Sequence, residues 1–443
     1  MPPLLMSRRF LPLFATQALG ALNDNLFKNA LAVLALFKAA EGGPEIVALA
    51  SGIFILPYLL FSATAGQIAD RFEKSRLIRI TKMWEVALML FATVGFLLGS
   101  IPLLIAVLFG LGCQATFFGP LKYAILPTHL AENELVSGNG LIEAGTFLGI
   151  LIGTILGGAL ILLDNGAAIV SALGLLIALG GLAAAWQVPV AASDQPDLRI
   201  GWNIVAETFR VVRSARRQRP IWRAILAVSW FWSLGAILVS QFPVVSKDVL
   251  GGGSALVTLL LAMFAIGIGV GSILCSRLLA GEVTQRYVPF AAMGLSLFAW
   301  DFAHACPDLA AHLAGVASGD DTARVWALLA DPLMWRLLAD LLLLAICGGL
   351  YSVPLYALIQ ELSAPSERSR MIGVNNIVNA GVIVVGALVV TALTNRGTPA
   401  PTIIAVTGWV NLGVVLWMVT IWKAETAEAL DRVRGWFSSR IRR

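Results

Sequence analysis

Two ionisable side chains, Asp24 and Lys28, interrupt an apolar stretch that is long enough to cross a membrane. They lie in NDNLFKN, residues 23–29, within the run from Phe10 to Phe37. An ionisable group near the centre of a bilayer costs roughly 2.5–3.5 kcal/mol on insertion scales, so such groups usually face a bundle interior or a wet cavity. The spacing of four residues places both charges on one helix face. We predict that they line a polar cavity, with a structural ion pair as the alternative.

Further polar side chains in other apolar stretches extend this candidate binding site. They offer hydrogen-bond donors and acceptors of every kind, from ammonium and carboxylate to amide and phenol. The predicted binding residues beside the charged pair are Gln17, Asn25, Lys122, Tyr123, Glu143, Gln241, Tyr351 and Asn376. Structural alternatives stay open, since Lys122 could reach the membrane surface, Glu143 could tether helices or carry a proton, and the asparagines could join helices by hydrogen bonds.

The composition is that of a polytopic membrane protein. Of the 443 residues, 58% are hydrophobic and only 13% are charged, whereas a soluble domain carries about 25% charged residues. No cleavage site follows a short apolar segment, so we expect the first helix to be retained. The four cysteines are far apart and form no CxxC pair, which predicts neither a metal site nor a disulfide framework. The net charge of +5 does not indicate nucleic-acid binding here.

Recurring apolar runs predict an all-α protein with twelve membrane-spanning helices. The predicted spans are 11–37, 46–69, 77–99, 102–127, 138–162, 167–188, 221–246, 254–280, 287–304, 334–361, 370–394 and 400–422. With these spans, most of the 31 lysines and arginines fall on one side of the membrane. They include the five from Arg71 to Lys82, which are assigned to the loop between the second and third spans. The positive-inside rule therefore predicts that both termini are cytoplasmic.

The chain is predicted to divide into two halves of six helices each. Residues 1–188 would form the first bundle, 189–220 a basic cytoplasmic linker, 221–423 the second bundle and 424–443 an amphipathic cytoplasmic tail. Two such halves suggest a binding site near the membrane midplane between repeats. The longest outer loop, 304–332, could hold a short helix.

A short basic segment after the second span, GQIADRFEKSRLIR (66–79), resembles the G-x-x-x-D-R-x-G-R-[KR] signature of the major facilitator superfamily. Glu73 stands where the second glycine is expected. The resemblance predicts a gate in which Asp70 caps a neighbouring helix and basic residues form ion pairs. The predicted gating residues are Asp70, Arg71, Lys74, Arg76 and, in the corresponding GSILCSRLLAG of the second half, Arg277. The alternative is a basic loop that only sets orientation.

Longer segments resemble the lysophospholipid transporter family within that superfamily. They are LNDNLFKNAL (22–31), LKYAILPTHLAENELVSGNGLIEAGTFLGILIGTILGG (121–158), GLYSVPLYALIQ (349–360) and SRMIGVNNIVNA (369–380). The resemblance covers nearly all of 10–420. It implies two six-helix bundles and a flippase of the bacterial inner membrane that moves lysophospholipids from the outer to the inner leaflet by alternating access. It also implies a functional link to a lysophospholipid acyltransferase that re-acylates the lipid, and it favours ethanolamine or glycerol head groups.

On this interpretation Lys28 would meet phosphate, and Asp24 would meet an amine or hydroxyl. The alternative function is proton-coupled transport of another amphipathic small molecule. An acyltransferase is disfavoured because His129, His304 and His312 lack an aspartate at the usual spacing. No glycine-rich phosphate loop ending in Lys-Ser or Lys-Thr is present, so neither ATP nor another cofactor is expected. The driving force and acyl-chain preference stay open.

Overall fold

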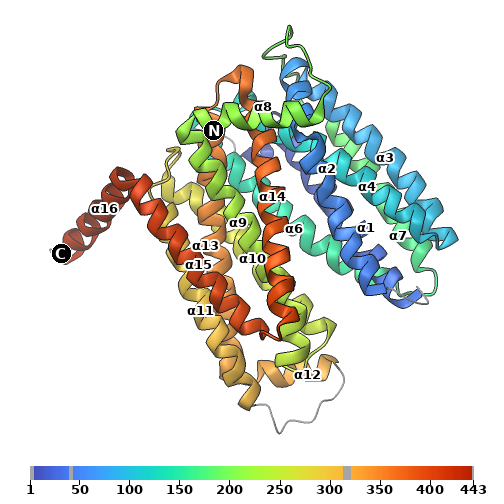
Figure 1. Cartoon of the computed structure of the whole chain (residues 1–443), viewed down its shortest axis with the longest axis vertical. Coiled ribbons are helices and arrows are strands. Elements are labelled where there is room, and N and C mark those ends of the chain that lie inside the picture. The colour runs from blue at the N-terminus through green and yellow to red at the C-terminus, as the bar shows by residue number, and fades with distance from the viewer. Residues whose placement is uncertain (1–3, 39–42, 313–320, 442–443) are drawn as a thin grey trace. The chain divides into compact units, whose positions relative to one another are not determined.

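The computed structural model describes residues 4–38, 43–312 and 321–441, which form helices without a β-strand among them (Figure 1). The long helices are α1 (Leu11–Lys38), α2 (Gly43–Arg71), α3 (Lys74–Leu98), α4 (Ile101–Ala124), α6 (Leu135–Leu160), α7 (Gly166–Ala185), α9 (Arg219–Val244), α10 (Ser254–Leu279), α11 (Val288–His312), α13 (Pro332–Leu362), α14 (Arg368–Asn395) and α15 (Ala400–Ile421). The shorter or peripheral helices are α5 (Leu126–His129), α8 (Ile204–Arg217), α12 (Asp321–Leu329) and α16 (Lys423–Ile441).

Each of the twelve predicted spans coincides with one long helix. In the described part of the chain, 10 helical segments are apolar and long enough to cross a membrane. The helices α1 and α11 have 28 and 25 residues and complete the set, although more polar residues interrupt them. A helix of that length exceeds the roughly 20 residues that a bilayer core requires.

Two loop regions are more ordered than their sequences indicate. Helix α11 runs to His312, beyond the expected end at 304, and α12 occupies part of the long loop. Residues 313–320 of that loop lie outside the described residues. In the polar stretch 189–220, α8 places Glu207, Val211 and Ala215 on one buried face, as expected for a helix with one packed side.

The chain divides into two compact units. The first comprises Met1–Ser229 with Ile359–Gly381, and the second comprises Trp230–Leu358 with Val382–Arg443. Helices α9, α13 and α14 therefore contribute residues to both units. In the first unit, α1 packs on α6 and α7, and α4 packs on α2 and α3.

Glycines hold α1 and α6 in backbone contact within the first unit. Gly149, Gly153 and Gly157 lie at intervals of four along α6, and a Cβ atom on Gly153 would lie only 2.3 Å from the Leu22 carbonyl oxygen. A Cβ on Gly157 would lie equally close to the carbonyl oxygen of Leu26. Small residues at this spacing let two membrane helices approach closely. The stripe thereby fixes α1 against α6.

A buried ion pair within α3 is hydrogen-bonded to two neighbouring helices of the same unit. The Lys82 ammonium lies 2.6 Å from Glu85 Oε2, and both side chains are 1% exposed. Asn23 of α1 donates to Glu85 Oε1 at 3.0 Å, and Gln114 of α4 donates to Oε2 at 3.2 Å. We name these four side chains the α3 brace. Since every carboxylate oxygen has a partner, the brace satisfies its charge inside the bundle.

In the second unit, α10 and α13 also meet through glycines. A Cβ on Gly271 would lie 2.1 Å from the Ile346 carbonyl oxygen, and one on Gly349 would lie 2.4 Å from the Ser272 nitrogen. Helices α11 and α15 pack together, and the Asn411 amide of α15 donates to the Ala292 carbonyl at 2.7 Å. Both units thus combine backbone contact with buried amide hydrogen bonds.

We expect Gly153→Ala to destabilise the protein. Its new methyl group would meet the Leu22 carbonyl oxygen, which belongs to a rigid helix, and overpacking of this kind costs about 1–3 kcal/mol. Thermal melts in detergent should show a lower melting temperature. Gly158→Ala on the same helix is the matched control, because a Cβ there meets nothing within 4 Å. Equal melting of the two variants would contradict the backbone contact.

We also expect Lys82→Met to destabilise the protein, because it leaves Glu85 charged and without its counter-ion. Breaking a buried pair from one side costs about 3–5 kcal/mol. The double variant Lys82→Met/Glu85→Gln should recover much of the loss in melting temperature, since it removes both buried charges and a glutamine keeps one oxygen that can accept from Asn23 or Gln114. A single variant that melts like the wild type would show that the brace contributes nothing.

Candidate functional site

Six charged side chains on four helices of the first unit lie within electrostatic range of one another as a group. Three are acids and three are lysines, so their formal charges cancel. They are Asp24 and Lys28 on α1, Lys82 and Glu85 on α3, Lys122 on α4 and Glu143 on α6. Asp24 is within electrostatic range of Glu85 and of all three lysines. The group therefore forms one charge-balanced cluster rather than isolated pairs.

The α3 brace is the internally satisfied part of this cluster. Sequence reasoning missed it, because Lys82 was counted with the basic loop, although α3 begins at Lys74 and Lys82 lies eight residues inside it. At 1.5 Å per residue the side chain starts about 12 Å into the helix. The signal was present in the sequence, since Lys82 and Glu85 form an i, i+3 charge pair inside a predicted span.

Asp24 and Lys28 form the accessible part of the cluster. Both side chains are half-buried, and no ion pair joins them among the described residues. The Lys28 ammonium lies 4.4 Å from the centre of the Phe54 ring, while Asp24 Oδ1 has no hydrogen-bond partner. A cation over an aromatic face keeps its hydrogen-bond donors available. Both side chains can therefore interact with a ligand that carries complementary charged groups.

Glu143 forms the third part of the cluster with two residues of α4. The Tyr123 hydroxyl donates to Glu143 Oε1 at 2.5 Å, and Glu143 Oε2 is buried without a partner. The half-buried Lys122 places its ammonium 4.8 Å from the Tyr123 ring centre and within electrostatic range of Glu143 and Asp24. An unpartnered buried carboxylate oxygen is costly. This group can therefore gain from an added donor or proton.

The predicted amides of α1 are engaged within the protein. Gln17 donates to Thr146 Oγ1 at 2.5 Å and to the Ile142 carbonyl at 2.8 Å, both on α6. Asn25 donates to the Ala21 carbonyl at 2.7 Å, one turn back on α1. Gln17 thus commits both amide N–H donors to α6, whereas this hydrogen bond of Asn25 uses one of its two donors.

Two neighbouring asparagines of α14 have spare hydrogen-bonding capacity. Asn376 Nδ2 has no partner and lies 2.8 Å from the position that a Cβ on Gly119 would occupy. Its neighbour Asn375, which was not among the predicted binding residues, is fully buried with neither amide atom hydrogen-bonded. Such groups are uncommon in folded proteins and often mark functional positions.

Two predicted binding residues belong to the second unit and are described within it. The Gln241 amide donates to Ser240 Oγ at 3.0 Å, and its side chain is buried. Tyr351 is fully buried, and its ring stacks on that of Phe231 with centroids 5.7 Å apart. This contact favours a packing role for the Tyr351 ring.

Among the predicted gating residues, Asp70 makes the densest set of contacts. This fully buried carboxylate accepts from the backbone N–H groups of Ser369 at 2.9 Å and Arg370 at 3.3 Å, and from Arg370 Nε at 2.9 Å. It thereby caps the first turn of α14, where unpaired N–H groups and the helix dipole favour an anion. Gly66 makes this approach possible, because a Cβ there would lie 2.8 Å from the Arg370 Cα.

The segment that follows α7 covers this contact. Ser193 Oγ donates to the Arg71 carbonyl at 2.7 Å, and Arg370 donates to Gln195 Oε1 at 2.8 Å. The buried Lys74 forms an ion pair with Asp194. We name residues 188–203 the strap. It ties the α2–α3 turn to the first turn of α14.

The remaining residues of the predicted gate differ in their surroundings. Arg71 stacks over the Phe72 ring at 5.2 Å, whereas Arg76 and Arg277 are exposed on α3 and α10. Glu73 accepts from the N–H groups of Ser75 at 2.8 Å and Arg76 at 2.7 Å, and so caps α3. Partial burial raises the pKa of Glu73, but these hydrogen bonds outweigh it and leave the pKa below its usual value.

The sequence of this chain is similar to those of known membrane transporters. The family model of the Major Facilitator Superfamily matches residues 13–319. The chain is 28% identical over 366 residues to the lysophospholipid transporter LplT of Escherichia coli O1:K1 / APEC, with 81% of each chain covered, and the same values hold for LplT of strain UTI89 / UPEC.

Solved structures show the same fold at low sequence identity. The human organic anion transporter MFSD10 (TETRAN) matches with a TM-score of 0.73 and 14% identity, covering 94% of this chain and 99% of that one. The fucose transporter FucP in the outward conformation matches with a TM-score of 0.63 and 13% identity, covering 92% and 97%. The predicted twelve-helix fold in two bundles is thereby confirmed, and the chain belongs to the major facilitator superfamily of membrane transporters.

Proposed function

We propose that this protein is a lysophospholipid transporter that moves lysophospholipids from the outer to the inner leaflet of the bacterial inner membrane by alternating access. The observation that carries the proposal is the incompletely satisfied part of the charge cluster. Asp24, Lys28, Lys122 and Glu143 present both charges with hydrogen-bonding capacity left over. The similarity to the LplT transporters over 81% of the chain supports the same substrate class.

The chemistry of a lysophospholipid head group fits these side chains. Its phosphate would take donors from Lys28 and Lys122, since an ammonium donates three hydrogen bonds. Its amine or hydroxyl would meet Asp24, and Glu143 Oε2 would accept a further donor. Ethanolamine and glycerol head groups suit this arrangement because both carry donors, which the quaternary amine of choline lacks.

Alternating access requires a contact that forms on one side only. We propose that the Asp70 cap on α14, held by the strap, closes the cytoplasmic side, with both termini cytoplasmic. Delivered lysophospholipid would then be re-acylated by a lysophospholipid acyltransferase in the inner leaflet. The division into bundles at 1–188 and 221–423, with a basic linker and an amphipathic tail, belongs to the same proposal.

A second candidate function is proton-coupled transport of another amphipathic small molecule. The unpartnered Oε2 of the buried Glu143 favours it, because a carboxyl in that place can take up a proton during each cycle. The two candidate functions are separated by measuring the flux of lysophosphatidylethanolamine and of unrelated amphiphiles into the same proteoliposomes. Each flux is measured with and without a pH gradient.

We expect Asp24→Asn to abolish most transport with little effect on stability. Among the described residues no ion pair holds Asp24, so the change breaks no direct contact. Loss of a charge-assisted hydrogen bond to the substrate, of about 1.5–3 kcal/mol, should lower the flux about tenfold or more. Uptake of a fluorescent lysophosphatidylethanolamine should be measured beside thermal melts of the same preparations. The double variant Asp24→Asn/Lys28→Met should also be stable and inactive. Transport by the double variant would contradict the proposed binding role of Asp24 and Lys28.

We expect Asp70→Asn to slow transport while the protein remains folded. An asparagine keeps an acceptor for one N–H group but loses the charge that pairs with Arg370 and favours the α14 terminus. The flux assay at equal expression is the measurement. Asp197→Ala is the control, because Asp197 is an exposed acid of the strap. Wild-type flux in Asp70→Asn would contradict the gating role and leave the basic segment 66–79 only the role of setting the orientation in the membrane.

A further inference from the structure

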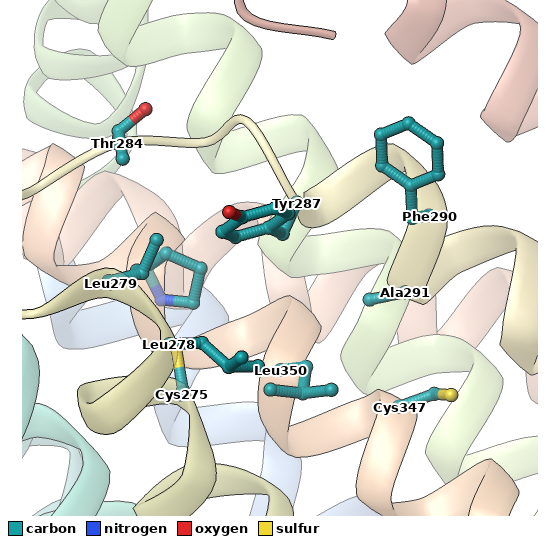
Figure 2. Close-up of a pocket in the computed structure, with 10 residues that line it drawn as sticks. Cys275, Leu278, Leu279, Thr284, Tyr287, Phe290, Ala291, Cys347 and Leu350 are labelled. Carbon is teal, nitrogen blue, oxygen red and sulfur yellow. The ribbon is translucent and has the colours of Figure 1, made fainter. Parts of the chain in front are cut away.

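An apolar pocket of about 230 Å³ lies in the second unit, where α10, α11 and α13 meet near the end of α10. Figure 2 shows its walls, which include Leu278 and Leu279 of α10, Ala291 of α11 and Leu350 of α13. An apolar cavity of about 150 Å³ already excludes water and accepts an apolar molecule. A pocket of this size and lining is therefore suited to hydrocarbon rather than to water.

The pocket continues into an apolar surface on two of its helices. On α10 the exposed apolar side chains are Ile266, Val270, Ile273, Leu274 and Leu278. On α11 they are Phe290, Met293 and Leu297. Leu278 and Phe290, which are 48% and 41% exposed, stand at the pocket end of these stripes and also line the pocket. A long exposed stripe of apolar side chains on a membrane-spanning helix faces lipid.

A braced loop, residues 280–287, closes the other side of the pocket. Its turn holds Ala280 at φ +50° and Gly281 at φ +86°, and Ala280 is the only non-glycine residue with positive φ in the described chain. The buried Arg286 pairs with Glu282 and with Glu428 of α16. Such a conformation persists only where surrounding contacts hold it.

The loop side of the pocket carries two polar side chains. Figure 2 shows Thr284 and Tyr287 there, above the apolar walls. Because α10 ends at Leu279, these two side chains lie at a helix end, where a membrane-spanning helix reaches the level of the head groups. Tyrosine is enriched at this level, since its ring is apolar and its hydroxyl is wet.

We propose that this pocket holds one acyl chain of a diacyl phospholipid from the surrounding leaflet, entering between Leu278 and Phe290. The exposed apolar stripes on both sides of that entrance face lipid, so a membrane lipid is the molecule available to enter. The apolar walls accept the methylene groups of its acyl chain. The hydroxyls of Thr284 and Tyr287 lie at the height of its ester and head group. The proposal concerns a lipid of the bilayer and is independent of the transported substrate.

Photocrosslinking in nanodiscs tests the occupant directly. The probe is a diacyl phosphatidylethanolamine with a diazirine at the end of one acyl chain, and mass spectrometry locates its adducts. We expect adducts on Leu279 and Leu350 to exceed those on Leu416, a 63% exposed residue of α15, by several-fold. Ala291→Leu should lower the pocket adducts several-fold, because the added carbons occupy the cavity.

Met293→Leu is the matched control, since Met293 lies on the lipid-facing stripe of the same helix and outside the pocket lining. It should leave the pocket adducts unchanged. Leu350→Phe fills the pocket from α13 and replaces Ala291→Leu if that variant does not fold. Adducts spread evenly over the pocket and Leu416 would overturn the proposal. Pocket labelling by a lysophosphatidylethanolamine probe alone would also overturn it, because the occupant would then be the substrate class.

Discussion

Charge balance inside the membrane is the constraint on which the first unit depends. Six ionisable groups are kept among apolar helices, and they are tolerable together because three positive and three negative charges lie within range of one another. Within this group, the charged atoms of the α3 brace all have partners, and the brace holds α1, α3 and α4 together. The rest of the group keeps unpartnered atoms, which a substrate with both charges could satisfy. Structural and proposed binding roles are thus distributed within one electrostatic system.

The helices and the most unusual charges could be predicted from the sequence alone. Runs of apolar residues identify twelve helices because a membrane allows few other structures, and Asp24 and Lys28 are conspicuous within one of those runs. The partners of these residues could not be predicted. Whether Lys28 meets Asp24 or the Phe54 ring depends on how α1 and α2 pack, and spacing along one helix does not contain that information.

Other misses have similar physical causes. Lys82 sits close to a basic loop in sequence, so counting charges by loop concealed its burial within α3. Glu73 looked like a departure from a glycine motif, yet its carboxylate caps α3 and receives the Ala191 N–H at 2.9 Å from the strap. The strap itself has no regular hydrophobic period. Its order comes from hydrogen bonds to distant residues such as Arg71 and Arg370, which local patterns do not reveal.

The glycine contact between α1 and α6 has a consequence for how specificity can change. Leu22 and Leu26 lie on the face of α1 that meets α6, and at 100° per residue Asp24 and Lys28 lie about 200° from them on the opposite face. Backbone contacts fix the first face and tolerate almost no new atoms. The second face lies away from these glycines, so a changed side chain there leaves the glycine contact intact. Under the proposed binding role, a change of ligand would therefore act through the face that carries positions 24 and 28, while the glycine contact keeps α1 in place.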